Sequence, residues 1–235
     1  PASALRYAKY ALSIFRSLSH EFGQMIANRA CSEAYRRDAE RVGVANRKVQ
    51  QLRLKEALTA SEAALAYARS LLTNKDALLV DIYIEHGSAW RDLARFYGQH
   101  PDLREVLAVD PIEESQTWLQ AGIDLAQTIP GARTQLIDAM IDLAYLRYYE
   151  ALSSTTDRAT LLAIAQTATE RAIAEIPATY RDLPFQAGQA KTLSVYWSLL
   201  TKAHGLLVTI IRQQPALQGH ITQLEGVVAD DARTL

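Results

Sequence analysis

Two pairs of carboxylates have a spacing that could support chemistry. Asp138 and Asp142 lie four positions apart, as do Asp81 and Glu85, so each pair shares one face of a helix. Such pairs can hold a metal ion or perform acid–base catalysis. Di-metal sites in helical bundles also need a Glu-x-x-His pattern from partner helices, and none of the five histidines supplies it. We therefore interpret both pairs as solvated acidic faces. We expect that the protein binds no metal or cofactor and is not an enzyme. An all-α enzyme that uses Asp138, Asp142 and Tyr145 is the least favoured hypothesis.

The remaining chemical candidates do not complete a known motif. His20-Glu21 lacks the second histidine of a zinc-protease helix, and neither glycine-rich phosphate-binding motif is present. Arg36 and Arg37 lie close to Cys31 in sequence and could lower the pKa of its thiol. A buried structural thiol is the more common case, and we expect it here.

Charge is distributed unevenly along a chain that is almost neutral as a whole. The 235 residues carry a net charge of -1, but residues 1–56 hold 11 Lys or Arg and 5 Asp or Glu. The predicted basic surface consists of Arg36, Arg37, Arg41, Arg47 and Lys48. Such a surface can contact phosphates, but it lacks the clustered aromatic residues that stack on bases. We favour docking on an acidic protein surface, which can belong to the same chain, and keep a nucleic-acid-contacting regulator as the alternative.

Composition also indicates where the protein works. Cys31 is the only cysteine, which excludes an internal disulfide and favours a reducing cytoplasm. No apolar run approaches the roughly 20 residues of a membrane span, so we expect no membrane partner. The chain opens with Pro1 instead of Met, and we expect it to be a fragment of a larger protein.

Apolar residues recur at spacings of three and four along most of the chain, which predicts an all-α protein of about eight helices. The first pattern, Leu5 to Ala30, predicts one helix or two nearly collinear helices. The second covers about 46–72, and Gly43 separates the two patterns. Together they predict a long basic N-terminal hairpin over residues 1–73.

Downstream patterns have clear start and stop signals. Asp110 is a plausible N-cap, and Pro111 suits a first helical turn. Pro130-Gly131 is a strong break. The predicted helices cover about 76–97, 111–129, 132–152, 157–176 and 186–212, with a last short helix after Pro215.

Two groups of residues in these helices match a repeat signature. The first-helix pattern W-x2-L-[G/A]-x2-Y is matched by Trp90, Leu93, Ala94 and Tyr97. The second-helix pattern is matched by Ala165, Thr169, Ala172 and Pro177. On these residues, the chain resembles the tetratricopeptide-repeat superfamily over most of residues 45–213.

The resemblance is to a divergent, stretched member of that superfamily. Met140 stands where the next unit would have its tryptophan, 50 residues after Trp90, whereas the usual unit has 34 residues. The resemblance implies a right-handed stack of antiparallel helical hairpins, a TPR-like α-solenoid, as a single domain over 1–235. Within it we expect the N-terminal hairpin over 1–73, divergent repeats over 76–213, and a short helix and tail over 215–235.

The same resemblance implies a concave groove lined by first helices. The groove-facing residues would be Ser88, Arg91, Arg95, Asp138, Tyr145, Tyr148 and Tyr149. The alternative is that Tyr145 and Tyr149 only pack within a hairpin and that Arg91 is solvated. We expect a protein–protein interaction scaffold, or the sensor arm of a larger cytoplasmic regulatory protein, that binds a protein or peptide in this groove.

Overall fold

The computed structural model describes residues 2–42, 46–73, 76–181 and 190–214, and every regular element in these ranges is helical. The chain divides into two compact units, Pro1–Ile129 and Pro130–Leu235, and each is described by itself. Gly131, next to the boundary, has a φ of 90°, which glycine adopts without steric strain. The all-α prediction is confirmed, and the break expected at Pro130-Gly131 coincides with the unit boundary.

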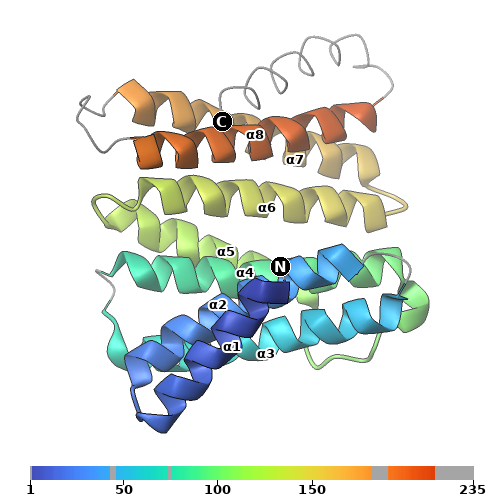
Figure 1. Ribbon diagram of the computed structural model, residues 1–235. Coiled ribbons are helices and arrows are strands. Elements are labelled where there is room, and N and C mark those ends of the chain that lie inside the picture. The colour runs from blue at the N-terminus through green and yellow to red at the C-terminus, as the bar shows by residue number, and fades with distance from the viewer. Residues whose placement is uncertain (1, 43–45, 74–75, 182–189, 215–235) are drawn as a thin grey trace. The chain divides into compact units, whose positions relative to one another are not determined.

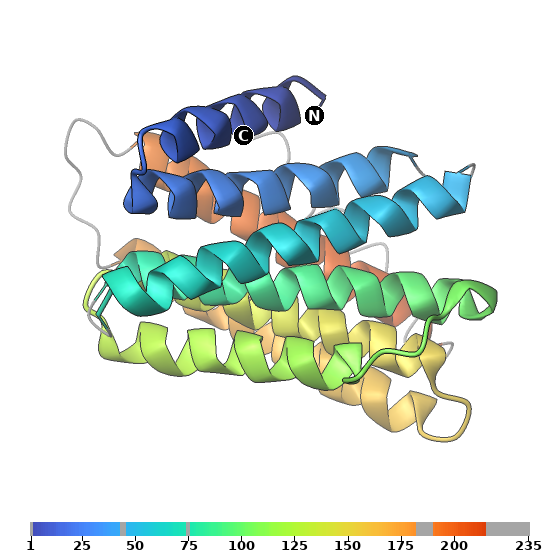
Figure 2. The same cartoon turned by 90° about the horizontal axis from the view of Figure 1, so that it is seen from below.

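The first unit consists of five α-helices and a short 3-10 helix. They are α1 (Ala2–Ser17), α2 (Glu21–Val42), α3 (Arg47–Leu71), α4 (Ala77–Gln99), η2 (Pro101–Leu103) and α5 (Pro111–Thr128). Figures 1 and 2 show α2 running beside α3 along much of its length. Helix α4 packs on α5 in the same extensive way, and α2 also touches α4. Helices α2 and α3 therefore form a hairpin, whereas the sequence predicted one hairpin of two helical segments over residues 1–73.

The chain reverses direction where the sequence predicted continuity. Helix α1 ends at Ser17, Ser19 has a φ of 51°, and α1 packs against α2. The expectation of one helix, or two collinear ones, from Leu5 to Ala30 is wrong. A Cβ on Gly23 would lie 2.3 Å from the Phe15 ring, so the glycine allows the two helices to approach closely. Apolar spacing continues across the turn, and no proline or glycine marks it.

Local capping explains where two helices begin. The Asn46 side chain accepts a hydrogen bond from the Val49 amide at the start of α3. Asp110 Oδ1 accepts one from the Ile112 amide at 2.7 Å, with Pro111 in the first turn of α5. The predicted N-cap at Asp110 is confirmed.

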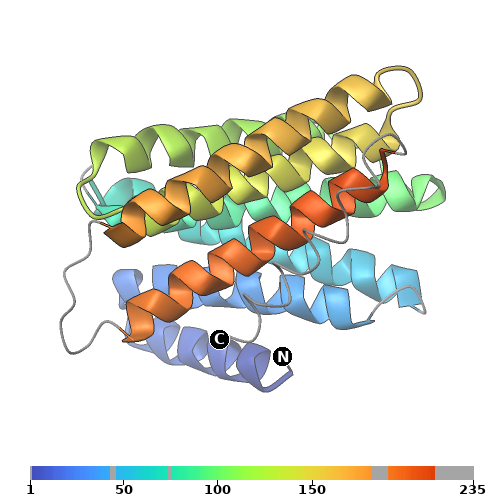
Figure 3. The ribbon, with the colours of Figure 1, turned by 90° about the horizontal axis from the view of Figure 1, so that it is seen from above.

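The second unit contains α6 (Arg133–Ser153), α7 (Arg158–Arg181) and α8 (Ala190–Arg212). Helix α6 packs on α7, and α8 contacts both (Figure 3). Helix α7 continues through Pro177, so the predicted end at Ile176 is wrong. Ile176 is fully buried in the core of this unit, and such packing outweighs a local breaking signal. The short helix predicted after Pro215 lies outside the described residues.

The first-helix signature residues form part of a hydrophobic core. Trp90, Leu93 and Tyr97 of α4 are buried in one cluster that also contains Ala39 of α2 and Leu54 of α3. Their spacing places three large side chains on the face of α4 that meets α2 and α3, so the motif has a packing function. Membership of the tetratricopeptide superfamily remains a prediction.

Candidate functional site

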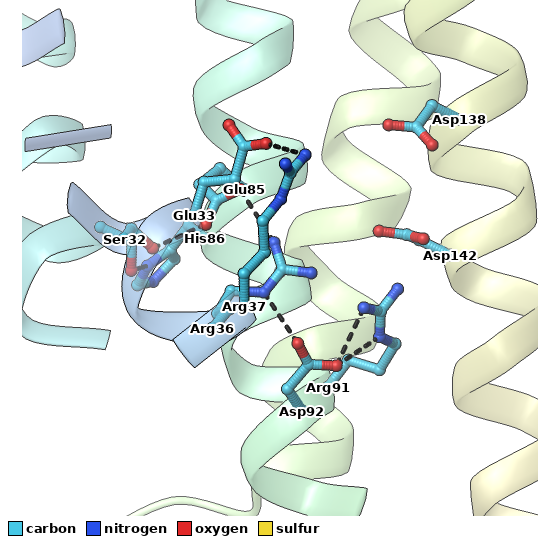
Figure 4. A network of polar contacts seen from close by, with 12 residues as sticks. Ser32, Glu33, Arg36, Arg37, Glu85, His86, Arg91, Asp92, Asp138 and Asp142 are labelled. Carbon is cyan, nitrogen blue, oxygen red and sulfur yellow. Dashed lines mark hydrogen bonds and ion pairs between the residues drawn. The ribbon is translucent and has the colours of Figure 1, made fainter. Parts of the chain in front are cut away.

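A buried polar cluster joins α2 to α4 (Figure 4). Ser32 Oγ donates a hydrogen bond to Glu85 Oε1 at 2.7 Å. The Arg36 guanidinium bridges two carboxylates, Glu85 Oε2 and Asp92 Oδ2, each at 2.8 Å. Arg91 binds the other oxygen of Asp92 through Nε at 3.0 Å and Nη2 at 2.9 Å. One arginine therefore links residues two helical turns apart on α4, and one carboxylate lies between two arginines.

The pKa values of the two carboxylates in this cluster shift in opposite directions. Burial raises the pKa of Glu85, and the charge of Arg36 and the Ser32 hydrogen bond oppose that rise. Burial would also raise the pKa of Asp92, but Arg91 and Arg36 hold it far below the usual range. Asp92 is therefore ionised at neutral pH. Removing one partner of such a buried pair costs far more than the pair itself contributes, because a bare charge is left inside the protein.

The interpretation of Asp81 and Glu85 as a solvated acidic face is wrong for Glu85. Its residue exposure is 7 %, and Asp81 is half-buried. Arg36, predicted in the basic surface, has a side-chain exposure of 16 % because it reaches into this cluster. The sequence separation between Arg36 and Glu85 leaves no local signal for the pair, and only the packing of α2 on α4 brings them together.

A serine and a histidine also meet inside the first unit. Ser61 Oγ lies 2.9 Å from His86 Nδ1, and Trp90 Nε1 donates to His86 Nε2 at 3.3 Å. Since Nε2 accepts, Nδ1 carries the ring proton and donates to Ser61, whose own hydroxyl donates to the Leu58 carbonyl at 2.8 Å. A nucleophilic serine needs the opposite direction, with its proton passing to the histidine. This pair is therefore a satisfied structural contact.

Three of the predicted groove residues lie on α4. Ser88 and Arg91 are buried, and Arg95 is half-buried. Arg95 Nη2 lies 3.4 Å from Glu40 of α2, and Arg91 is engaged by Asp92. The alternative of a solvated Arg91 is wrong, because its exposure is 7 %. A partner-binding role for these three residues stays a prediction.

The other predicted basic residues lie in the C-terminal part of α2 and in the first turn of α3. Arg37 pairs with Glu33 at 2.5 Å, and Arg41 pairs with Asp38 at 3.1 Å. Both arginine side chains are mostly exposed. Arg47 and Lys48 are also exposed, at the first turn of α3. Of the five residues predicted in the basic surface, these four remain accessible to a nucleic acid.

The predicted acidic pair of the second unit is organised by a lysine that the sequence did not single out. Lys202 Nζ of α8 lies 2.8 Å from Asp138 Oδ1 and 2.6 Å from Asp142 Oδ1 of α6. The Asp142 side chain is 4 % exposed, and that of Asp138 is 40 % exposed. The solvated interpretation is therefore wrong for Asp142. The contact depends on α6 packing on α8, and no local sequence pattern predicts it.

Among the three predicted groove tyrosines of α6, Tyr149 lies next to both of the others. Ring centroids lie 6.0 Å apart for Tyr145 and Tyr149 and 5.7 Å apart for Tyr148 and Tyr149. Tyr148 is buried in a cluster with residues of α7 and α8, and the other two pack against that cluster. The hairpin-packing alternative thus accounts for much of their surface. Whether they also bind a partner stays a prediction.

The described residues offer neither a metal site nor a reactive thiol. In the described ranges, no group of three or more His, Cys, Asp or Glu side chains is placed to hold a metal ion. Cys31 is buried, and burial raises the pKa of its thiol. The prediction of a buried structural thiol is confirmed.

Comparison with protein-family models gives no match, and comparison with curated proteins gives no significant similarity. Within the part of the chain that the structure describes, no helix combines the length and apolarity needed to cross a membrane. The geometry defines the class as an all-α protein whose neighbouring helices pack side by side.

Proposed function

We propose that this protein is an interaction scaffold that binds another protein, acting as the interaction arm of a larger cytoplasmic regulatory protein. One observation carries the proposal: a row of large apolar side chains is exposed along α1 and at the residue that follows it, Leu18. This row, the outer stripe, consists of Tyr7 (63 % exposed), Tyr10 (66 %), Ile14 (39 %) and Leu18 (67 %).

The outer stripe is a second apolar face on a helix that already has one. Leu5 and Ala8 of α1 are buried against α2 and α3, with Leu12 packed beside them. At about 100° of rotation per residue, the outer stripe lies on another side of the helix. A contiguous apolar stripe at this position favours a covering surface, on a partner protein or on another domain of the same polypeptide.

Site-specific photo-crosslinking tests this proposal in cells that express the chain naturally. A photoreactive amino acid at position 10 should crosslink to one defined protein surface, and the same amino acid at position 170, exposed on α7, should not. The protein so identified would then be purified and its affinity for the chain measured by calorimetry.

Matched variants decide whether the outer stripe is the binding surface. The triple substitution Tyr7→Ser, Tyr10→Ser and Leu18→Ser should weaken binding at least about tenfold, since aromatic anchors dominate interfaces. The control replaces three exposed apolar residues of the second unit, Leu152, Ile164 and Val195, with serine and should leave the affinity unchanged. Equal affinities for the two triple variants would refute the proposal.

The nucleic-acid alternative rests on the exposed cations at Arg37, Arg41, Arg47 and Lys48. It requires binding to generic DNA or RNA that weakens steeply as salt increases. Undetectable binding at low salt would eliminate it.

A further inference from the structure

The first unit also contains a groove of about 610 Å³ between α1 and α3. Its floor is formed by Cys31 and Tyr35 of α2, which are buried, and its rim includes Lys9 and Arg16 of α1, which are exposed. Lys9 and Arg16 lie roughly 150° around α1 from the outer stripe, at about 100° per residue. The groove is therefore a separate surface from the one that carries the proposed function.

The charge that lines this groove is mainly positive. Lys9 Nζ lies over the Tyr35 ring, 4.8 Å from its centroid, and a hydrogen bond with Tyr35 raises the pKa of Lys9. Lys55 adds a cation from α3 and is bound to Glu105. The lining carboxylate, Glu56, is neutralised by Arg53 at 2.6 Å. Lys9 and Arg16 therefore present the charge that a ligand would meet.

The positions of these groups match the repeat of a helix. Lys9 and Arg16 are seven residues apart on α1, which separates them by about 10 Å along the axis. Leu12 lies between them and is half-buried, and Leu52 on the opposite wall is 53 % exposed. Two cations with an apolar strip between them complement carboxylates two turns apart with apolar side chains between those carboxylates.

The openness of the groove favours a helix over a small molecule. Small-molecule sites enclose most of their ligand, whereas the rim residues Lys9, Ser13 and Arg16 on α1 and Thr59 on α3 are all exposed. A ligand here would keep one side in solvent. Amphipathic helices bind in this way, with only their apolar face in the groove.

We propose that the groove between α1 and α3 binds one face of an acidic amphipathic helix from a partner protein. Carboxylates of that helix pair with Lys9 and Arg16, and its apolar side chains contact Leu12 and Leu52. The inference rests on the proposed scaffold function and names a second binding surface for it.

The test uses the full chain and two fluorescent helical peptides of equal length and apolar content. The acidic peptide carries Glu at two positions seven residues apart with Leu between them, and the basic peptide carries Lys in place of each Glu. Fluorescence anisotropy should show saturable binding of the acidic peptide at least tenfold tighter than that of the basic peptide. The affinity should fall as salt screens the ion pairs.

Charge-reversal variants locate the site. The double substitution Lys9→Glu and Arg16→Glu should weaken acidic-peptide binding at least tenfold and should strengthen binding of the basic peptide. The control, Arg158→Glu and Arg171→Glu, makes the same change in net charge at exposed positions of α7 and should alter the affinity less than twofold. Circular dichroism and the unfolding midpoint of each variant identify any loss of folding.

Three results would overturn the proposal. These are equal binding of the two peptides, equal weakening by both double variants, and saturable binding of dodecanoate at Lys9 and Arg16 without peptide binding. If any one of them occurs while crosslinking at position 10 still identifies a partner, the groove proposal fails and the outer-stripe proposal stands. If the acidic peptide binds as expected but the outer-stripe variants bind normally, the outer-stripe proposal fails and the groove proposal stands.

Discussion

His86 gives the sharpest prediction because its protonation is coupled to folding. Burial, together with the charge of Arg69, lowers the pKa of His86 from 6.5 to about 4. The residue is 4 % exposed, and its ring is held by Ser61 and Trp90. In the unfolded chain the imidazole would titrate near its ordinary value of about 6.5. The unfolded state therefore takes up a proton first as the pH falls.

The sign and size of the effect on stability follow from this difference in pKa. The contribution of His86 to the free energy of unfolding is fully present above about pH 6.5, and it is lost as the pH falls toward 4, because the native state keeps the imidazole neutral. The complete loss is about 3 kcal/mol, and about 2 kcal/mol of it should be gone at pH 5.0. Glu85 titrates in the opposite sense, since burial raises its pKa, so a variant must separate the two effects.

The substitution His86→Asn provides that separation. The Asn amide can donate to Ser61 as Nδ1 does, but it does not titrate. Urea unfolding at pH 7.5 and pH 5.0 would be followed by tryptophan fluorescence, since Trp90 and Trp118 lie next to His86. The wild-type chain should lose about 2 kcal/mol more than the variant between these pH values.

Direct NMR titration of the His86 ring nitrogens checks the same reasoning without unfolding. It should report a native pKa near 4 and the tautomer that is protonated at Nδ1. A native pKa close to 6.5, a proton on Nε2, or identical pH dependence in wild type and His86→Asn would refute the argument.

Three further perturbations probe the packing and the buried charges. Gly87→Ala places a Cβ 2.8 Å from Leu119 Cγ and 3.0 Å from its backbone nitrogen, so the unfolding free energy should fall by about 1–3 kcal/mol. Gly205→Ala, with nothing within 4 Å, is the control and should not lower stability; equal losses would contradict the packing of α4 on α5. Asp92→Asn leaves buried guanidinium groups without their shared counter-charge, and denaturant unfolding should show a loss of about 3 kcal/mol, whereas a loss below 1 kcal/mol would mean that the cluster is solvated. Cys31 should react with a disulfide reagent at least about tenfold more slowly in the native protein than in urea, because its thiol is buried and has a raised pKa; similar rates would show that the thiol is accessible.

Periodicity located most helices because it reflects which side chains must leave water. The N-cap at Asp110 and the break at Pro130-Gly131 were also predictable, since each acts through its own backbone. The turn at Ser19 was not, because it has no breaking residue and apolar spacing continues across it. The continuation of α7 past Ile176 was missed for a related reason: burial in the core outweighs a neighbouring proline.

The candidate site was predicted less well than the helices. The charge pattern predicts Arg36 at the basic surface, and the spacing of Asp138 and Asp142 predicts a solvated Asp142. Each charge is instead compensated by a residue distant in sequence, Arg36 by Glu85 and Asp92, and Asp142 by Lys202. A helical face can be inferred from spacing, but the residue opposite that face cannot.

The sequence by itself determined that the chain is helical, where most helices begin and end, and that its N-terminal part is rich in basic residues. These properties depend on local backbone preferences and on the spacing of apolar side chains. Only the tertiary structure decided that α1 folds back on α2, which side chains neutralise one another, and that α1 carries an exposed apolar stripe on one side and borders a cationic groove on another. Those properties depend on contacts between residues far apart in the chain, where burial and charge compensation outweigh local preference.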